Sequence, residues 1–191
     1  VAGTAEGENY VTEISNRLCG LDYRVELLAT QDSEHATKFC ADFAPEFDLV
    51  VAMGGDGTMS EVVEGVLKNE KRPEIGLIPT GSVNDFARGV GLFERESEEI
   101  VEIAANGRAV DMDTGWLNDN SFFYVAAFGA FTSVSYRTSQ SQKNAFGKLA
   151  YIAEGMKDLG NIESKHLRIT TDKETFEDDY VLGIISNSNS I

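Results

Sequence analysis

A short apolar run that leads directly into three glycines and an aspartate constrains the fold of this chain more than any other feature. Residues 48–53 are continuous enough for a strand that is covered on both faces. Behind the glycines, apolar residues recur at positions 59, 62, 63, 66 and 67, which is the spacing of a helix buried along one side. Glycines let backbone N–H groups approach an anion closely, and the helix directs its positive end to the same place. The pattern predicts a strand, an anion-binding turn and a helix in immediate succession.

The pattern on either side extends this unit. Helical spacing covers residues 11–18, 36–43 and 94–105, and strands are predicted at 23–30 and 75–79. Strands that alternate with helices predict an α/β domain with a parallel sheet, which we place at residues 1–108. The chain opens on a helix with no strand before it, so we expect a first strand to lie upstream.

The rhythm changes in the second half. Strands are predicted at residues 110–116, 121–128, 166–171 and 180–186, and one helix near 149–159 interrupts them. This pattern indicates a β-rich second domain over residues 109–191. The pattern breaks off shortly after Ile184 and Ile185, and we therefore expect the chain to be incomplete at both ends.

Charge and composition exclude several functions. The chain has 191 residues, with 32 Asp and Glu against 16 Lys and Arg, for a formal charge of −16. This balance argues against nucleic-acid binding, which needs a basic surface. Two cysteines and two histidines are too few for a disulfide framework or a histidine-based zinc site. Without a long apolar run or a signal peptide, the chain is expected to be cytoplasmic and to lack a transmembrane segment.

A second polar loop follows the next predicted strand. Residues 78–88 read IPTGSVNDFAR, so that Gly81 precedes Ser82, Asn84 and Asp85 at the start of a short helix. Carboxyl ends of neighbouring parallel strands meet at one edge of a sheet, where ligands of open α/β sheets bind. The two loops are therefore expected to lie side by side.

Asp56 is the unusual member of the first loop. A carboxylate beside a polyphosphate is repulsive unless a cation lies between them, so Asp56 indicates Mg²⁺ or a hydroxyl that it orients. The plain structural alternative is a glycine turn with an aspartate that caps a helix. Capping boxes are predicted at both helix starts, from Thr58 to Glu61 and from Ser82 to Asp85.

The motifs GGDGT at residues 54–58 and PTGSVNDFARGVGL at residues 79–92 resemble the catalytic domain of bacterial diacylglycerol kinase-like lipid kinases. The resemblance extends along essentially the whole chain, including VDMDTGW at 110–116 and KNAFGKLAY at 143–151. GGDG alone is shared with NAD kinases and sphingosine kinases, whereas the NDFAR segment is typical of the lipid-kinase branch.

The resemblance implies a Rossmann-like three-layer domain followed by a β-sandwich, and an enzyme that uses ATP and Mg²⁺. It implies transfer of the γ-phosphoryl group to a lipid hydroxyl such as that of diacylglycerol. Asp56 and Asp85 become the catalytic candidates, while the family's base and structural metal site are expected beyond residue 191. The implied nucleotide contacts are Thr30, Gly54, Gly55, Asp56, Gly57, Thr58, Met59, Ser60, Ser82 and Asn84.

Two other functions stay open. One is an NAD kinase-like enzyme, and the other is a regulatory module that binds a nucleotide without catalysis. Between Asp119 and Glu154 there is no acidic residue, while Arg137, Lys143 and Lys148 supply positive charge. We therefore expect residues 131–148 to dock on an anionic lipid surface, which would place the protein at the inner face of the membrane. A homodimer is a further expected assembly.

Overall fold

The computed structural model describes residues 5–129 and 164–187, and it separates into two compact units. One comprises the described residues up to Tyr124 together with Asn187, and the other comprises those between Val125 and Ser186. The predicted domain boundary at residues 108 and 109 falls inside the first unit and stays a prediction.

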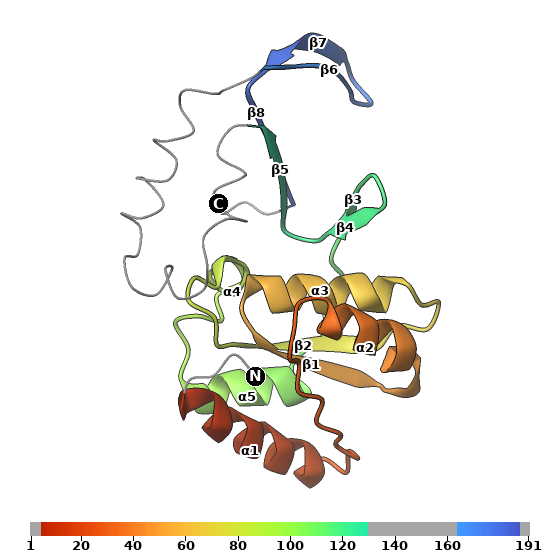
Figure 1. Cartoon of the computed structure of the whole chain (residues 1–191). Coiled ribbons are helices and arrows are strands. Elements are labelled where there is room, and N and C mark those ends of the chain that lie inside the picture. Colours follow the sequence, from red (N-terminus) through yellow and green to blue (C-terminus); the bar gives the residue numbers. More distant parts are fainter. Residues whose placement is uncertain (1–4, 130–163, 188–191) are drawn as a thin grey trace. The chain divides into compact units, whose positions relative to one another are not determined.

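The first unit is a three-layer sandwich of helices around a parallel sheet (Figure 1). Strands β1 (Leu49–Gly54) and β2 (Glu74–Pro79) pair in parallel, with Leu49 opposite Glu74 and Gly54 opposite Pro79. One face carries α2 (His35–Phe43) and α3 (Asp56–Leu67), and the other carries α1 (Ala5–Gly20) and α5 (Ser97–Asn106). The short helices η1 (Ala44–Glu46) and α4 (Asp85–Gly89) also belong to this unit.

Side chains of β1 alternate between two cores, as a strand between two helical layers requires. Val50 and Ala52 pack with α2 and α3 around Val62 and Val66. Leu49, Val51 and Met53 pack with α1 and α5 on the opposite face. The predicted α/β architecture with a parallel sheet is confirmed.

Residues 23–30 differ from the prediction, because they pair with no strand in the described part of the chain. A strand exists through a ladder of backbone hydrogen bonds, and here a cavity separates the segment from the edge of β1. The apolar side chains of Tyr23, Val25 and Leu27 alternate as in a strand, but this pattern does not show whether a neighbouring strand is there to pair with.

The second half is strand-rich, as predicted, and its described strands form antiparallel pairs. In the first unit, β3 (Gly115–Leu117) pairs with β4 (Asn120–Phe122). In the second unit, β5 (Val125–Gly129) pairs with β8 (Leu182–Ser186), and β6 (Lys165–Thr170) pairs with β7 (Thr175–Tyr180).

Strand predictions in this half need correction. Of the strand predicted at 110–116, only Gly115 and Trp116 lie in a strand, because residues 110–114 form no ladder with the described strands. The strand predicted at 121–128 is divided, because Phe123 and Tyr124 turn inward and pack edge-on against Phe86. Strand β7 was missed because three acidic residues, 177–179, interrupt its sequence, TFEDDY, and leave only Phe176 and Tyr180 as apolar residues on one face. The predicted helix near 149–159 and the predicted docking stretch at 131–148 lie outside the described residues.

Candidate functional site

The two glycine loops meet at the carboxyl end of the parallel sheet. The Thr80 amide donates a hydrogen bond of 2.9 Å to the carbonyl of Gly54, which joins the ends of β1 and β2. A Cβ atom on Gly81 would lie 2.4 Å from the Cα atom of Gly55, so any side chain here would force the loops apart. The expectation that the loops lie side by side is met.

Asn84 holds the second loop closed. Its side-chain oxygen accepts a hydrogen bond of 3.0 Å from the Gly81 amide, and its side-chain nitrogen donates one of 2.7 Å to the Gly81 carbonyl. Asn84 has φ 55° and ψ 48°, a left-handed conformation that asparagine tolerates better than most residues. With 3% of its surface exposed, Asn84 is buried, and its amide group positions Gly81.

Asp56 ties the first loop to the helix that follows the second. One carboxylate oxygen accepts a hydrogen bond from the amide of Asp85, and the other accepts one from the amide of Phe86, each at 3.0 Å. The negative charge thus lies at the amino end of α4, whose first amides have no partner within the helix. Each oxygen can still accept a further bond, so the carboxylate keeps the capacity to bind a cation or a hydroxyl.

Both predicted capping boxes are wrong. Helix α3 begins at Asp56 behind Gly55, three residues earlier than Thr58 would require as a cap. Helix α4 begins at Asp85 behind Asn84, so Ser82 is not its cap either. The first amides of α4 are satisfied across the loops by Asp56, and a pattern within one helix cannot indicate this.

Glu61 of α3 binds the first turn of the neighbouring helix α2 instead of the start of its own helix. Its carboxylate accepts a hydrogen bond of 3.2 Å from the amide of Ala36, at the start of α2. In return the Thr37 hydroxyl donates to the Glu61 carbonyl at 3.1 Å. Sequence reasoning missed this contact between α2 and α3, because nothing in the spacing of Glu61 indicates a partner 25 residues away.

Glycine is needed for different reasons at two positions of the first loop. A Cβ atom on Gly54 would lie 2.4 Å from the Thr58 hydroxyl oxygen, so packing requires a glycine there. Gly57 is different, because a Cβ atom on it would meet nothing within 4 Å. The backbone at the start of α3 therefore faces open space at Gly57, where the first-turn amides of a helix attract anions.

The other expected nucleotide contacts lie in several environments. Met59 is buried in the core, with only 7% of its surface exposed. Ser60 is half-buried, whereas Ser82 and Asp85 are exposed. Thr30 and Thr58 line a cavity of about 400 Å³ beside β1, which none of the glycines of the two loops lines. The structure thus groups the two loops together and places Thr30 in a neighbouring hollow.

Arg88 strengthens the second loop, a role that sequence reasoning did not assign. Its guanidinium group donates a hydrogen bond of 3.1 Å to the Val83 carbonyl and lies 3.5 Å from the centre of the Phe93 ring. The side chain therefore links the loop before α4 to the segment after it. The signal that could have found it is the NDFAR motif itself, in which Arg88 is the last residue.

The site suits an anionic ligand held through backbone groups better than a metal held by side chains. Within residues 5–129 and 164–187, no three His, Cys, Asp or Glu residues gather as metal ligands. Asp56 and Asp85 bring two carboxyl groups to the paired loops, so a cation there would need further ligands from a bound phosphate or water.

Comparison with known proteins decides the family. The sequence profile of the diacylglycerol kinase catalytic domain matches residues 1–117. The chain belongs to the diacylglycerol kinase catalytic domain family. It is 35% identical to the diacylglycerol kinase of Bacillus subtilis (strain 168) over 160 residues, which are 84% of this chain and 52% of that protein. It is 34% identical to the diacylglycerol kinase of Staphylococcus carnosus (strain TM300) over 176 residues, which are 88% of this chain and 57% of that protein.

A solved structure agrees with this membership in the diacylglycerol kinase family. A crystal structure of a diacylglycerol kinase from Bacillus anthracis str. Sterne superposes with a TM-score of 0.72 at 27% identity, covering 95% of this chain and 59% of that one. The chain therefore spans little more than half the length of the family members it matches. Among the described helices, none is both long and apolar enough to cross a membrane.

Proposed function

We propose that this chain carries the nucleotide-binding part of an ATP-dependent lipid kinase, which transfers the γ-phosphoryl group of ATP to a lipid hydroxyl such as that of diacylglycerol. The observation that carries the proposal is the open backbone at Gly57, beside two glycine loops that Asp56 and Asn84 hold together. Membership of the diacylglycerol kinase family supports the choice of a lipid acceptor.

The loops would hold the phosphates of ATP through backbone amides. A glycine at position 57 keeps a side chain out of the space above the first turn of α3, so a phosphate oxygen can approach those amides. When bound, ATP would supply the phosphoryl group and Mg²⁺ would compensate its charge. Such a site suits an acidic protein, because the donors are local and do not depend on net charge.

Asp56 and Asp85 would act in different ways. Asp56 keeps α4 against the first loop through its two hydrogen bonds, and we assign it a positioning role besides any contact with a cation. Asp85 is exposed at the start of α4, so it is free to approach a cation or the substrate hydroxyl. Thr30, Ser60 and Ser82 remain proposed nucleotide contacts.

A transfer assay on the complete polypeptide tests this proposal. The protein is incubated with Mg²⁺, radiolabelled ATP and diacylglycerol in mixed micelles, and NAD replaces the lipid in a parallel reaction. We expect labelled lipid and no labelled NAD. Labelled NAD would favour the NAD kinase-like alternative, and nucleotide binding without transfer to lipids that carry a hydroxyl would favour the regulatory module.

The lipid acceptor would be reached at a membrane surface. Residues 131–148, which carry the basic charge, are the proposed docking stretch, and a homodimer stays a further proposal. Co-sedimentation with anionic vesicles compares the wild type with the triple variant Arg137→Gln, Lys143→Gln and Lys148→Gln. Equal binding of both at low salt would remove this stretch as the docking site.

A further inference from the structure

Asn187 lies where the chain returns to the first unit, which it leaves after Tyr124. Strand β5 begins and strand β8 ends at this crossing, and their terminal residues Val125 and Ser186 are partners in the ladder. The amide of Asn187 continues that ladder by one step, since it donates a hydrogen bond of 2.8 Å to the carbonyl of Tyr124. The two passages of the chain are therefore held together by the backbone itself.

The side chain of Asn187 adds two hydrogen bonds at the same place. Its Nδ2 atom donates to the carbonyl of Asp113 at 2.6 Å and to the carbonyl of Phe123 at 3.0 Å. These carbonyls come before β3 and after β4, so Asn187 binds both ends of the hairpin that those strands form. Both partners are acceptors, and the NH₂ group of an amide offers two N–H donors from one atom. An ionised aspartate of the same shape would offer none.

Phe123 and Tyr124, whose carbonyls Asn187 binds, carry buried aromatic rings that pack within the first unit. Both rings meet the ring of Phe86 edge-on. The ring centres lie 4.8 Å from that of Phe86 for Phe123 and 6.1 Å from it for Tyr124, within the range in which aromatic pairs attract. Asn187 thus fixes the backbone from which both rings reach Phe86.

Phe86 connects this aromatic cluster to the paired glycine loops. Its ring packs against the rings of residues 123 and 124, while its amide donates to the carboxylate of Asp56 at 3.0 Å. Helix α4 has only five residues, too few to be stable without contacts to the rest of the fold. The placement of α4, which begins at Asp85, therefore depends on attachments such as these two.

We propose that Asn187 is a positioning residue for the paired loops. By fixing residues 123 and 124, it holds their rings against Phe86 and so keeps the first turn of α4 at Asp56. The contribution to catalysis rests on the proposed function, because that turn carries the carboxylate of Asp85, which we assign to a cation or the substrate hydroxyl. The effect on the geometry of α4 holds without it.

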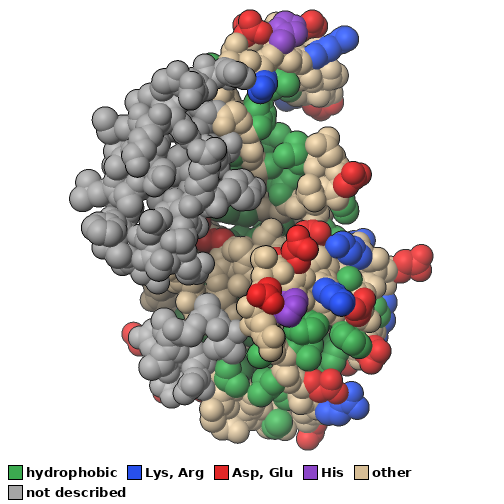
Figure 2. Space-filling view, viewed as in Figure 1, with side chains coloured by type: hydrophobic (Ala, Val, Ile, Leu, Met, Phe, Trp, Pro, Cys, Tyr) green, Lys and Arg blue, Asp and Glu red, His purple; other side chains and the backbone are tan. Residues whose placement is uncertain are grey.

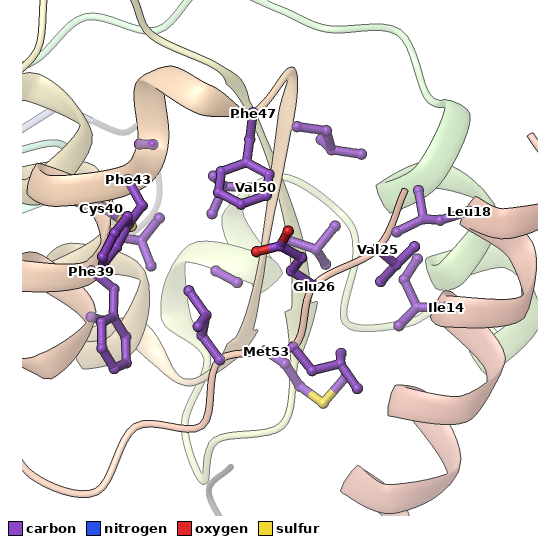
Figure 3. Close-up of a pocket in the computed structure, with 18 of the residues that line it drawn as sticks. Ile14, Leu18, Val25, Glu26, Phe39, Cys40, Phe43, Phe47, Val50 and Met53 are labelled. Carbon is purple, nitrogen blue, oxygen red and sulfur yellow. The ribbon is translucent and has the colours of Figure 1, made fainter. Parts of the chain in front are cut away.

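Asn69 offers a matched control in the same unit. Its Nδ2 atom also donates to two carbonyls, at 3.0 Å to Cys40 and at 3.3 Å to Gly65. Asn69→Asp and Asn187→Asp each remove an NH₂ group with two bonds and add one charge to a surface on which acidic and basic side chains are already interspersed (Figure 2). Cys40 lines the cavity beside β1 (Figure 3), and of the described residues that line this cavity none belongs to α4. The two variants thus differ in whether the lost bonds lead to α4.

Hydrogen exchange of the complete polypeptide, resolved at single amides by NMR, tests the placement of α4. We expect Asn187→Asp to speed exchange of the Asp85 and Phe86 amides at least about tenfold relative to amides of β2, because α4 then opens locally. A merely structural effect would speed all these amides alike, and Asn69→Asp shows its size. An unchanged ratio in Asn187→Asp, or an equal change in both variants, overturns the proposal.

Milder substitutions keep the test decisive if Asn187→Asp does not fold. Asn187→Ala removes both donors without adding charge, and Phe123→Leu removes the edge-on contact with Phe86 but keeps an apolar side chain. If Asn187 acts through Phe123, the two changes are not additive, and the Phe86 amide of the double variant exchanges about as fast as in the faster single variant. An acceleration equal to the product of the two single effects would show independent action and overturn the proposal.

Phosphoryl transfer to diacylglycerol supplies the functional measurement, at a temperature where the wild type and both aspartate variants are folded. We expect kcat to fall about tenfold to a hundredfold in Asn187→Asp, as small misplacements of catalytic groups cause, and to stay near the wild-type value in Asn69→Asp. Wild-type kcat in Asn187→Asp would overturn the contribution to catalysis. Absence of transfer in the wild type would contradict the proposed function alone, because the exchange comparison does not use activity.

Discussion

At the scale of single residues, the site depends on two polar side chains that bind backbone groups of the loops. The Asn84 side chain hydrogen-bonds to the amide and the carbonyl of Gly81, and Asp56 accepts hydrogen bonds from the first two amides of α4. The bonds of Asp56 join segments about 30 residues apart, and the bonds of Asn84 stabilise a left-handed turn. Asp56 and Asn84 therefore stabilise the loops in addition to any contact with a ligand.

Asp56→Asn separates this positioning role from the proposed catalytic one. An amide offers one acceptor oxygen instead of two and directs an NH₂ group at a backbone N–H, so we expect a loss of about 1.5–3 kcal/mol in the free energy of unfolding. Asp85→Asn changes an exposed side chain, and its effect should stay within about 0.5 kcal/mol. Denaturant unfolding of both variants measures the difference. Equal stability would show that the bonds from Asp56 to α4 do not hold the loops.

At the scale of secondary-structure elements, periodicity predicted most of the first unit. Helices α1, α2, α3 and α5 and strands β1 and β2 were found because each buries a regular stripe or a continuous run. The helix starts could not be predicted, because Asp56 and Glu61 satisfy amides of other helices. The prediction of a strand at residues 23–30 was wrong, because an alternating side-chain pattern does not show that a hydrogen-bonded neighbour is present.

Glu61 provides a test of contacts between helices. Glu61→Ala leaves the Ala36 amide at the start of α2 without its acceptor, and we expect a loss of about 1 kcal/mol, as for removal of a helix cap. Glu61→Gln keeps an acceptor oxygen and should lose less. The thermal unfolding of the two variants distinguishes these cases. If both melt together with the wild type, the contact between α2 and α3 does not contribute to stability.

The hairpin of β6 and β7 should respond to pH through His166. Hydrogen bonds to Asp179 and Glu177 raise the pKa of His166 above its ordinary value of 6.5. Because the pKa is raised in the folded state, the stabilisation is fully present below pH 6.5 and is lost as the pH rises through the folded-state pKa. An NMR titration should give a midpoint above 6.5, and Asp179→Asn should lower it. An unchanged midpoint in that variant would exclude the contact with Asp179.

At the scale of the whole molecule, the chain is an acidic, two-unit member of the diacylglycerol kinase family that spans little more than half of its relatives. The family and the α/β sheet could be predicted from GGDGT and NDFAR, because these motifs need particular glycines and polar residues. How the described strands of the second half pair could not be predicted, because an acidic run such as residues 177–179 of β7 interrupts the apolar pattern. The cavity beside β1 could be found only from the structure.

Calorimetric titration of the complete polypeptide with ATP and Mg²⁺ tests most directly whether the open backbone at Gly57 receives the phosphates of ATP. Gly57→Ala adds one methyl group over the first turn of α3, and Gly20→Ala is the matched control, since a Cβ atom at either position meets nothing within 4 Å. Both variants should fold, because alanine is favoured over glycine in helices by up to about 1 kcal/mol. We expect Gly57→Ala to weaken ATP binding at least about tenfold, equivalent to about 1.4 kcal/mol, while Gly20→Ala binds like the wild type. Wild-type affinity in Gly57→Ala would contradict the claim.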